Sequence, residues 1–303
     1  MVGQKRQQKR QRRASMMKAG QVTVTLSNGV RMPMEGFGVY QIADPAECAQ
    51  MTEAAIRCGY RLIDTAAFYG NEESVGAAIR TAGVPREELF VTTKLWVQDM
   101  SYENAGKAFE TSREKLGLDS IDLYLIHQPF GDFFSAWRRL EELYHEGKVR
   151  AIGVSNFFPA QLANFCETVA VKPMVNQVEL HPFFCQEAAL ATMQYYGVAP
   201  QAWAPLARGK RGIFVHPVLT KIGARYGKTA AQVALRWNVQ RGVSIIPKSA
   251  NEERMAQNLA IWDFQLTDVE MAAISQLDIG HSEISFHDDP AYVRRMHARK
   301  IHG

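Results

Sequence analysis

The chain has 303 residues, of which 47% are apolar and 22% charged, the balance of a globular protein with a sizeable core. Its length suits one large α/β domain or two ordinary ones, and no stretch reaches the ~20 apolar residues that would span a bilayer. Residues 1–19 hold seven of the 35 basic residues and no acid, which leaves 28 basic against 31 acidic residues elsewhere. The body of the chain therefore lacks the positive charge of a nucleic-acid-binding protein.

Residues 1–20 are expected to form a disordered basic tail or an expression remnant, or to precede a later start at Met16 or Met17. A basic arm that touches RNA or guides import is the alternative. The segment has no apolar core of a signal peptide. The four cysteines are scattered without CxxC or metal-ligand spacing, which favours reduced thiols in a cytoplasmic protein and predicts no metal site.

From residue 22 the sequence alternates between strand and helix signals. A hairpin is expected first, over 22–26 and 30–32 with a turn at 27–29. Apolar, strand-like runs then centre near residues 36, 63, 92, 124, 152, 176, 201 and 245. The helices between them have readable ends: Asp44, Thr229 and Thr267 suit N-caps, and glycines such as Gly117 and Gly227 suit the residue that ends a helix.

Eight strand–helix units predict an α/β fold, a (β/α)8 TIM barrel over residues 21–280 with the hairpin as an N-terminal cap. Residues 281–303 are expected to form a C-terminal specificity loop over the barrel mouth. A doubly wound sheet is the alternative, but it would usually carry a glycine-rich dinucleotide turn after its first strand. Residues 36–41 lack the third glycine of that turn and no helix signal follows directly.

Ionisable side chains close three successive predicted strands. Asp64, Lys94 and His127 each stand at a strand end, and Tyr69 follows Asp64 by five residues. In a barrel these ends meet at the mouth where chemistry occurs. A lone Asp–Lys pair or a lone strand-end His is more often structural, but their co-location indicates a catalytic site.

The four groups suit proton transfer to a polarised oxygen. Tyr69 is the expected general acid, because a phenol holds its proton at neutral pH. We expect the Lys94 ammonium to lower the pKa of that phenol, and Asp64 to fix and compensate the ammonium. His127 can donate a hydrogen bond to a substrate carbonyl. Lys94 could instead form a Schiff base in an aldolase or lyase, but Asp64 should keep its amine charged.

Residues 59–72, with the sequence GYRLIDTAAFYGNE, closely resemble a signature of the aldo-keto reductases. Residues 91–96, 122–127 and 147–157 resemble further motifs of that family in the same order. The resemblance spans about residues 22–280 and points to members such as 2,5-diketo-D-gluconate reductases and prostaglandin F synthase-like enzymes. It implies NAD(P)H-dependent reduction of an aldehyde or ketone with Asp64, Tyr69, Lys94 and His127 as the catalytic residues.

The remaining strand ends can hold the nicotinamide cofactor. Hydroxyl and amide groups there suit the carboxamide, Trp203 offers a stacking face, and residues 204–209 resemble a pyrophosphate loop. Lys248, Ser249 and Arg254 suit the 2′-phosphate of NADPH, since a basic helix start is unfavourable without an anion. The expected NADPH/NADP+ ligands are Gly38, Ser155, Asn156, Gln177, Trp203, Leu206, Arg208, Ile246, Lys248, Ser249, Arg254, Gln257 and Asn258.

Aromatic residues are expected to line a substrate pocket above the nicotinamide. The candidates are Tyr40, Trp96, His127, Gln128 and Phe130, with Phe133 or Phe134. Gln128 stands where the family very often has Trp, which predicts a more polar or more open pocket. The resemblance favours a keto-sugar, a dicarbonyl or a prostaglandin-like substrate.

The expected protein is a monomer that acts on a small carbonyl compound and binds no membrane, and its barrel is expected to bind no nucleic acid. The alternative from a different class is a regulatory barrel that senses NADPH and catalyses weakly. Slow turnover of every small carbonyl combined with tight NADPH binding would favour that alternative.

Overall fold

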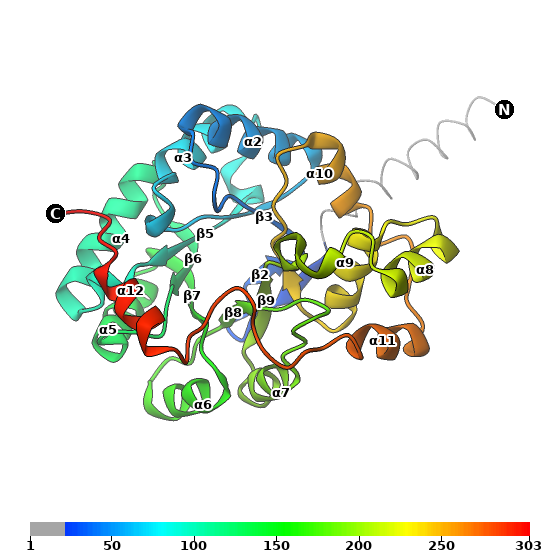
Figure 1. Cartoon of the computed structure of the whole chain (residues 1–303). Helices are drawn as coiled ribbons and strands as arrows, with labels where there is room; N and C mark the ends of the chain where they lie inside the picture. The colour runs from blue at the N-terminus through cyan, green and yellow to red at the C-terminus, as the bar shows by residue number, and fades with distance from the viewer. Residues whose placement is uncertain (1–21) are drawn as a thin grey trace.

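The centre of the molecule is a sheet of eight parallel strands, seen here in a computed structural model that describes residues 22–303. The strands follow chain order around the sheet, each paired with the next (Figure 1). They coincide with all eight predicted runs. Their bounds are β3 (Gly36–Gly38), β4 (Leu62–Asp64), β5 (Phe90–Leu95), β6 (Ile121–Ile126), β7 (Val149–Ser155), β8 (Val175–Glu179), β9 (Ala199–Trp203) and β10 (Ser244–Ile245).

The first and last strands meet and close the sheet into a barrel. Glu35 forms a parallel bridge with Ile245, whose backbone N–H donates to the Met34 carbonyl at 2.9 Å. The approach is tight at Gly36, where a Cβ would lie 2.2 Å from the Leu62 side chain and 3.0 Å from that of Ile246. The (β/α)8 barrel prediction is confirmed, and the doubly wound alternative is wrong.

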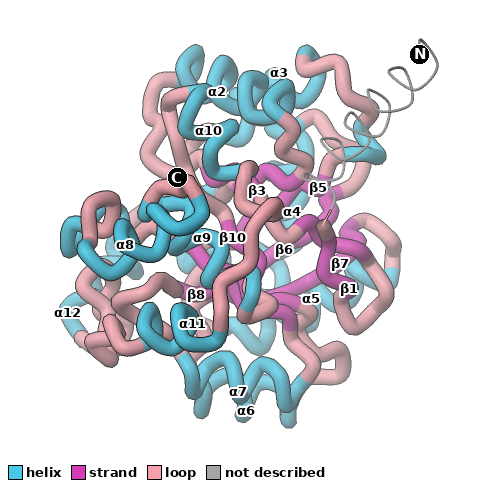
Figure 2. Tube along the Cα trace, turned by 90° about the vertical axis from the view of Figure 1, so that its right-hand side faces the viewer, coloured by secondary structure: helices cyan, strands magenta, loops and turns pink. Residues whose placement is uncertain are grey.

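Helices surround the strands on the outside (Figures 1 and 2). The predicted caps are present: the Asp44 side chain accepts from the Glu47 N–H, and Thr229 and Thr267 both form capping boxes. None of the helices within residues 22–303 has the length and apolar character to cross a membrane. Their bounds are α2 (Pro45–Cys58), α3 (Glu72–Thr81), α4 (Tyr102–Leu116), α5 (Phe133–His145), α6 (Pro159–Thr168), α7 (Glu187–Tyr196), α8 (Pro217–Tyr226), α9 (Ala230–Gln240), α10 (Glu252–Leu259), α11 (Asp268–Ser275) and α12 (Pro290–Ala298).

The predicted hairpin is formed by β1 (Thr23–Thr25) and β2 (Arg31–Pro33), which pair antiparallel. Met32 is fully buried, with its sulfur 3.8 Å from Gln201 Nε2, and Ser244 Oγ donates to the Pro33 carbonyl at 3.1 Å. These contacts place the hairpin beneath the barrel, at the amino-terminal ends of the strands. The opposite rim is left open for a site. The basic tail predicted for residues 1–20 lies outside the described residues.

The C-terminal segment contains a helix, where the sequence predicted a loop. Pro290 is the first residue of α12, and the Asp289 side chain accepts from the Ala291 N–H at 2.8 Å. Tyr292 and Met296 of this helix are buried in an apolar cluster with Trp96, which follows β5. Local capping and this apolar face together account for the helix.

Glu35 is a buried acid at the closing seam of the barrel. Its side chain is 6% exposed, and its only hydrogen-bond donor among the described residues is the Trp262 indole N–H, at 2.5 Å. Its second oxygen is buried without a partner in residues 22–303. Burial raises the pKa of Glu35 to about 8, although Trp262 and then Arg236 oppose the shift.

The raised pKa predicts a stability that falls as the pH rises. Between pH 4.5 and about 8 the folded protein holds a proton on Glu35 that the unfolded chain has lost, so the free energy of unfolding decreases across this window. Glu35→Gln keeps an acceptor for Trp262 but cannot ionise. From pH 5 to pH 9, urea titrations should show the unmodified protein losing at least ~1 kcal/mol more than Glu35→Gln. Equal losses would show that Glu35 is ionised throughout.

Candidate active site

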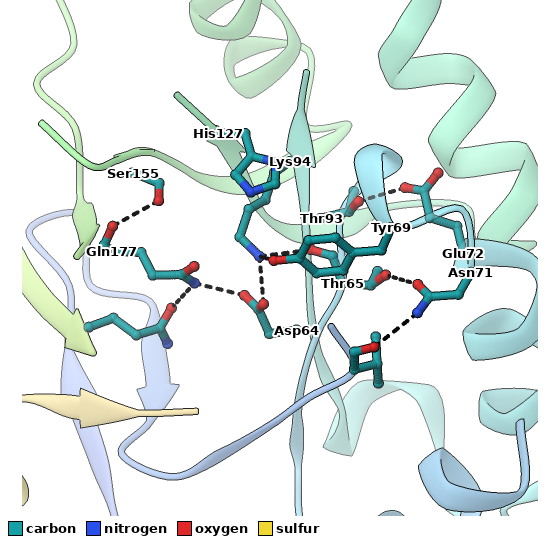
Figure 3. A network of polar contacts seen from close by, with 12 residues as sticks. Asp64, Thr65, Tyr69, Asn71, Glu72, Thr93, Lys94, His127, Ser155 and Gln177 are labelled. Carbon is teal, nitrogen blue, oxygen red and sulfur yellow. Dashed lines mark hydrogen bonds and ion pairs between the residues drawn. The ribbon is translucent and has the colours of Figure 1, made fainter. Parts of the chain in front are cut away.

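The four predicted catalytic side chains meet at the carboxyl ends of neighbouring strands (Figure 3). Asp64 ends β4, Lys94 lies near the end of β5, and His127 follows β6. Tyr69 ends a short 3-10 helix, Ala67–Tyr69, that follows β4. Its ring lies 5.6 Å from that of His127 in an edge-to-face arrangement.

Lys94 is the centre of this group. Its Nζ donates to Asp64 Oδ1 at 2.5 Å, to the Thr65 carbonyl at 2.9 Å and to Tyr69 Oη at 3.4 Å. The side chain is fully buried, as is that of Asp64. Burial lowers the pKa of the Lys94 ammonium, and the adjacent Asp64 carboxylate opposes that shift. Three acceptors match the three ammonium hydrogens, so the cation is satisfied without water.

The pKa of the Tyr69 phenol differs from the expectation. Burial, and after it the charge of Asp64, raises this pKa well above its usual range, whereas Arg208 lowers it. The Lys94 ammonium, 3.4 Å from Tyr69 Oη, does not outweigh these two effects. The prediction of a lowered pKa in the resting protein is therefore wrong. Tyr69 keeps its proton at neutral pH and is available as a donor.

His127 is neutral in this environment. Burial and the nearby Lys94 charge hold the pKa of its imidazole well below the usual range. Its Nδ1 is buried with no partner among residues 22–303. Because an orphaned buried N–H is rarer than an orphaned acceptor, we place the proton on Nε2. That N–H then faces the cavity described below.

Two glutamines extend the ion pair into the barrel. Gln177 Nε2 donates to Asp64 Oδ2 and to Gln201 Oε1, both at 2.7 Å, and Gln201 Nε2 donates to Ser244 Oγ at 3.2 Å. All four residues are buried. Gln201 and Ser244 were missed from the sequence, although a glutamine inside the apolar run 198–202 is a signal that could have revealed one of them.

Several residues that were predicted to hold a nicotinamide are hydrogen-bonded to one another. Asn156 Nδ2 donates to the His127 carbonyl at 3.0 Å, and Asn156 Oδ1 accepts from the Trp203 indole N–H at 2.8 Å. Ser155 Oγ donates to the Gln177 carbonyl at 2.8 Å. Gln177 Oε1 accepts no hydrogen bond within the described residues, so it remains available to a ligand in the cavity. The network holds the Trp203 ring and this free oxygen in place.

A single cavity of about 590 Å³ opens above these groups. Most of the predicted ligands line it. Tyr292, Arg295 and Met296 of α12, with Arg299 directly after the helix, form part of its wall. Ser249, Arg254, Gln257 and Asn258 do not line the cavity but lie just beyond Lys248, in the loop before α10 and in α10 itself. The predicted residues in the lining are Gly38, Tyr40, Asp64, Tyr69, Trp96, His127, Gln128, Ser155, Asn156, Gln177, Trp203, Leu206, Arg208, Ile246 and Lys248.

Three aromatic residues predicted for the substrate pocket lie elsewhere. Phe133 and Phe134, at the start of α5, pack against Phe165 of α6. Phe130 packs against Tyr292 of the C-terminal segment at 6.3 Å between ring centroids, outside the cavity lining. The C-terminal segment covers Phe130, which sequence spacing could not reveal.

Cations lie along one side of the cavity. The Arg208 guanidinium lies 5.2 Å from the Tyr40 ring and 5.8 Å from the Trp203 ring. Lys248 Nζ donates to the Gln41 carbonyl at 3.0 Å. Within residues 22–303, neither these two cations nor Arg254 forms a salt bridge, so all three remain available to an anion.

The loop that carries Arg208 has an unusual backbone. Ala204, Ala207, Arg208 and Arg211 all have positive φ, between 48° and 53°. This left-handed conformation is uncommon for residues other than glycine. Strain of this kind is concentrated at ligand-binding sites, which agrees with a loop that holds a bound group.

A barrel with these side chains at its carboxyl rim defines an oxidoreductase site for carbonyl groups. The family model "Aldo/keto reductase family" matches residues 35–279. The chain belongs to the aldo/keto reductase family, and the resemblance seen in the sequence is confirmed.

Known relatives cover most of this chain. It is 50% identical over 257 residues to "9,11-endoperoxide prostaglandin H2 reductase" of Trypanosoma cruzi, which covers 84% of this chain and 91% of the relative. It is 47% identical over 257 residues to "Glyoxal reductase" of Bacillus subtilis, with 84% and 92% covered. A crystal structure of a Bombyx mori aldo-keto reductase in complex with NADP matches with a TM-score of 0.84 at 37% identity, covering 88% and 96%.

The buried ion pair predicts a non-additive effect on stability. Asp64→Asn leaves the Lys94 ammonium without its counter-charge and should reduce the free energy of unfolding by about 3 kcal/mol. Combining it with Lys94→Met removes the stranded charge, so the double variant should be more stable than Asp64→Asn alone. Urea denaturation followed by circular dichroism measures the free energy of unfolding of the unmodified protein, of Asp64→Asn and of the double variant. A double variant that is less stable than Asp64→Asn would contradict the pairing.

Proposed function

We propose that this protein reduces aldehydes or ketones to alcohols with NADPH as the hydride donor and Tyr69 as the general acid. The observation that carries the proposal is that Tyr69 and the neutral His127 line one cavity, with the buried Lys94 ammonium 3.4 Å from Tyr69 Oη. A carbonyl oxygen between Tyr69 and His127 would be polarised by two donors.

The residues present fit NADPH. The Trp203 face and the free Gln177 oxygen suit the nicotinamide and its carboxamide, and Arg208 on its left-handed loop suits the pyrophosphate. Lys248 and Arg254, without acidic partners among the described residues, suit the 2′-phosphate. When bound, the cofactor supplies a hydride to the carbonyl carbon.

The chain's own residues handle the proton. His127 Nε2–H orients the carbonyl and Tyr69 donates its hydroxyl proton to the oxygen. Lys94, 3.4 Å from Tyr69 Oη, stabilises the phenolate as it forms. A high pKa in the resting protein is compatible with this role, because an alkoxide is a far stronger base than a phenolate. The name of one relative, a glyoxal reductase, supports a carbonyl substrate.

Tyr69→Phe removes the proton donor, together with one acceptor of the Lys94 ammonium. With NADPH and 4-nitrobenzaldehyde, kcat should fall by about 100- to 10 000-fold, whereas the Kd for NADPH from fluorescence quenching should change less than threefold. Tyr195→Phe, an exposed tyrosine on α7, is the matched control and should keep full activity. Full activity in Tyr69→Phe would remove Tyr69 from the mechanism.

Arg254→Ala tests the preference for the phosphorylated cofactor. Loss of a charge-assisted contact should raise the Kd for NADPH by about tenfold or more and leave that for NADH within twofold. Arg138→Ala, an exposed residue of α5, should alter neither constant. Equal weakening of both cofactors by Arg254→Ala would contradict the assignment of the phosphate site.

A further inference from the structure

Gln128 is a buried amide on the wall of the cavity, directly after His127. Its side chain is 7% exposed and belongs to the cavity lining. Its Oε1 lies 2.9 Å from Nε2 of His287, a residue of the C-terminal segment far away in the sequence. This hydrogen bond joins the end of β6 to the segment that precedes α12.

The imidazole of His287 is held on several sides by aromatic rings. Its centroid lies 6.0 Å from that of Phe130, 5.6 Å from that of Phe158 and 5.2 Å from that of Tyr292. Phe130 is thereby placed behind the cavity wall, where it supports His287. The ring cannot move without disturbing this packing, so the position of its Nε2 is well defined.

The hydrogen bond determines which end of the Gln128 amide faces the cavity. Burial lowers the pKa of His287 to about 4, although Asp288 opposes the shift, so the ring is neutral at pH 7. With Gln128 Oε1 as the acceptor, the proton of the neutral imidazole lies on Nε2. The other end of the amide is its NH2 group, which forms no hydrogen bond with any residue of 22–303. Two unused N–H donors are therefore available at the cavity.

We propose that Gln128 is a specificity-determining residue that binds a second oxygen of the substrate, on the carbon next to the reacting carbonyl, and that His287 is its positioning residue. The inference deepens the proposed reduction and rests on it. Tyr69 and His127 would hold the reacting oxygen, and the Gln128 NH2 is the adjacent donor along the chain. Vicinal diones and α-hydroxy ketones present such an oxygen.

A substrate with one oxygen would leave this amide unpaired. Displacing water from a buried N–H without replacing its hydrogen bond carries a penalty, and sites built around a polar contact discriminate by it. The expected consequence is a preference for the oxygen-bearing substrate beyond its intrinsic reactivity. The contribution of Gln128 is therefore measured by how a Gln128 variant changes the ratio of kcat/KM between two substrates that differ only in this oxygen.

The test compares hexane-2,3-dione with hexan-2-one, which differ by one oxygen. Gln128→Met keeps the length of the side chain and removes the donors. With NADPH as the cofactor, kcat/KM for the dione should fall about tenfold, whereas kcat/KM for hexan-2-one should not fall, because the variant no longer has an amide that this substrate leaves unpaired. NADPH affinity and thermal unfolding are measured for each variant, so that a folding defect is separated from lost recognition.

The His287 variants test positioning. His287→Phe keeps an aromatic ring but loses the N–H, and it should raise KM for the dione about fivefold with kcat unchanged. His287→Gln, whose amide nitrogen reaches about as far as Nε2, should restore KM to within twofold. His297→Phe is the matched control, because His297 also packs against Phe130 but does not contact Gln128; its kinetics should be unchanged.

The outcomes separate this inference from the proposed function. Equal losses for dione and monoketone in Gln128→Met, or a His287→Phe variant with an unchanged KM, would overturn the inference and leave carbonyl reduction standing. An unmodified protein that reduces neither these ketones nor 4-nitrobenzaldehyde would overturn the proposed function and the inference with it.

Discussion

Burial of the Lys94 ammonium beside the Asp64 carboxylate is the constraint on which the rest of the site depends. Two charges removed from water need each other and further hydrogen bonds, or their desolvation dominates. The structure supplies these through the Thr65 carbonyl, Tyr69 Oη and the Gln177 amide. The phenol is thus fixed at the floor of the cavity by the same contacts that satisfy the cation.

That arrangement also explains why a phenol with a raised pKa suits the site. Burial keeps the resting phenol protonated, so a donor is ready at neutral pH. As charge develops on the phenol oxygen, the nearby ammonium can stabilise it in surroundings of low dielectric, where such an interaction is strong. The ammonium then stabilises the transition state of proton transfer more than the resting phenol, and only such a difference accelerates the reaction.

The C-terminal segment completes the cavity through contacts at several strand ends. Trp96 donates to the Arg299 carbonyl at 2.8 Å, and Ser282 Oγ donates to Glu179 Oε2 at 2.6 Å. Gln128 and His287 form a third link. Each link uses a polar side chain at or just after the end of a strand. The carboxyl ends of the strands, which carry the catalytic side chains, therefore also hold the C-terminal segment in place.

Much of the architecture was determined by the sequence alone, because its signals are local. The alternation of apolar runs and capped helices predicted eight strands. Positions at or near the strand ends predicted that Asp64, Tyr69, Lys94 and His127 lie close together. Only the tertiary structure decided how these groups behave. The raised pKa of the Tyr69 phenol, the packing of Phe133 against Phe165 and the pairing of Gln128 with His287 depend on distances between segments remote in sequence, and no local pattern encodes them.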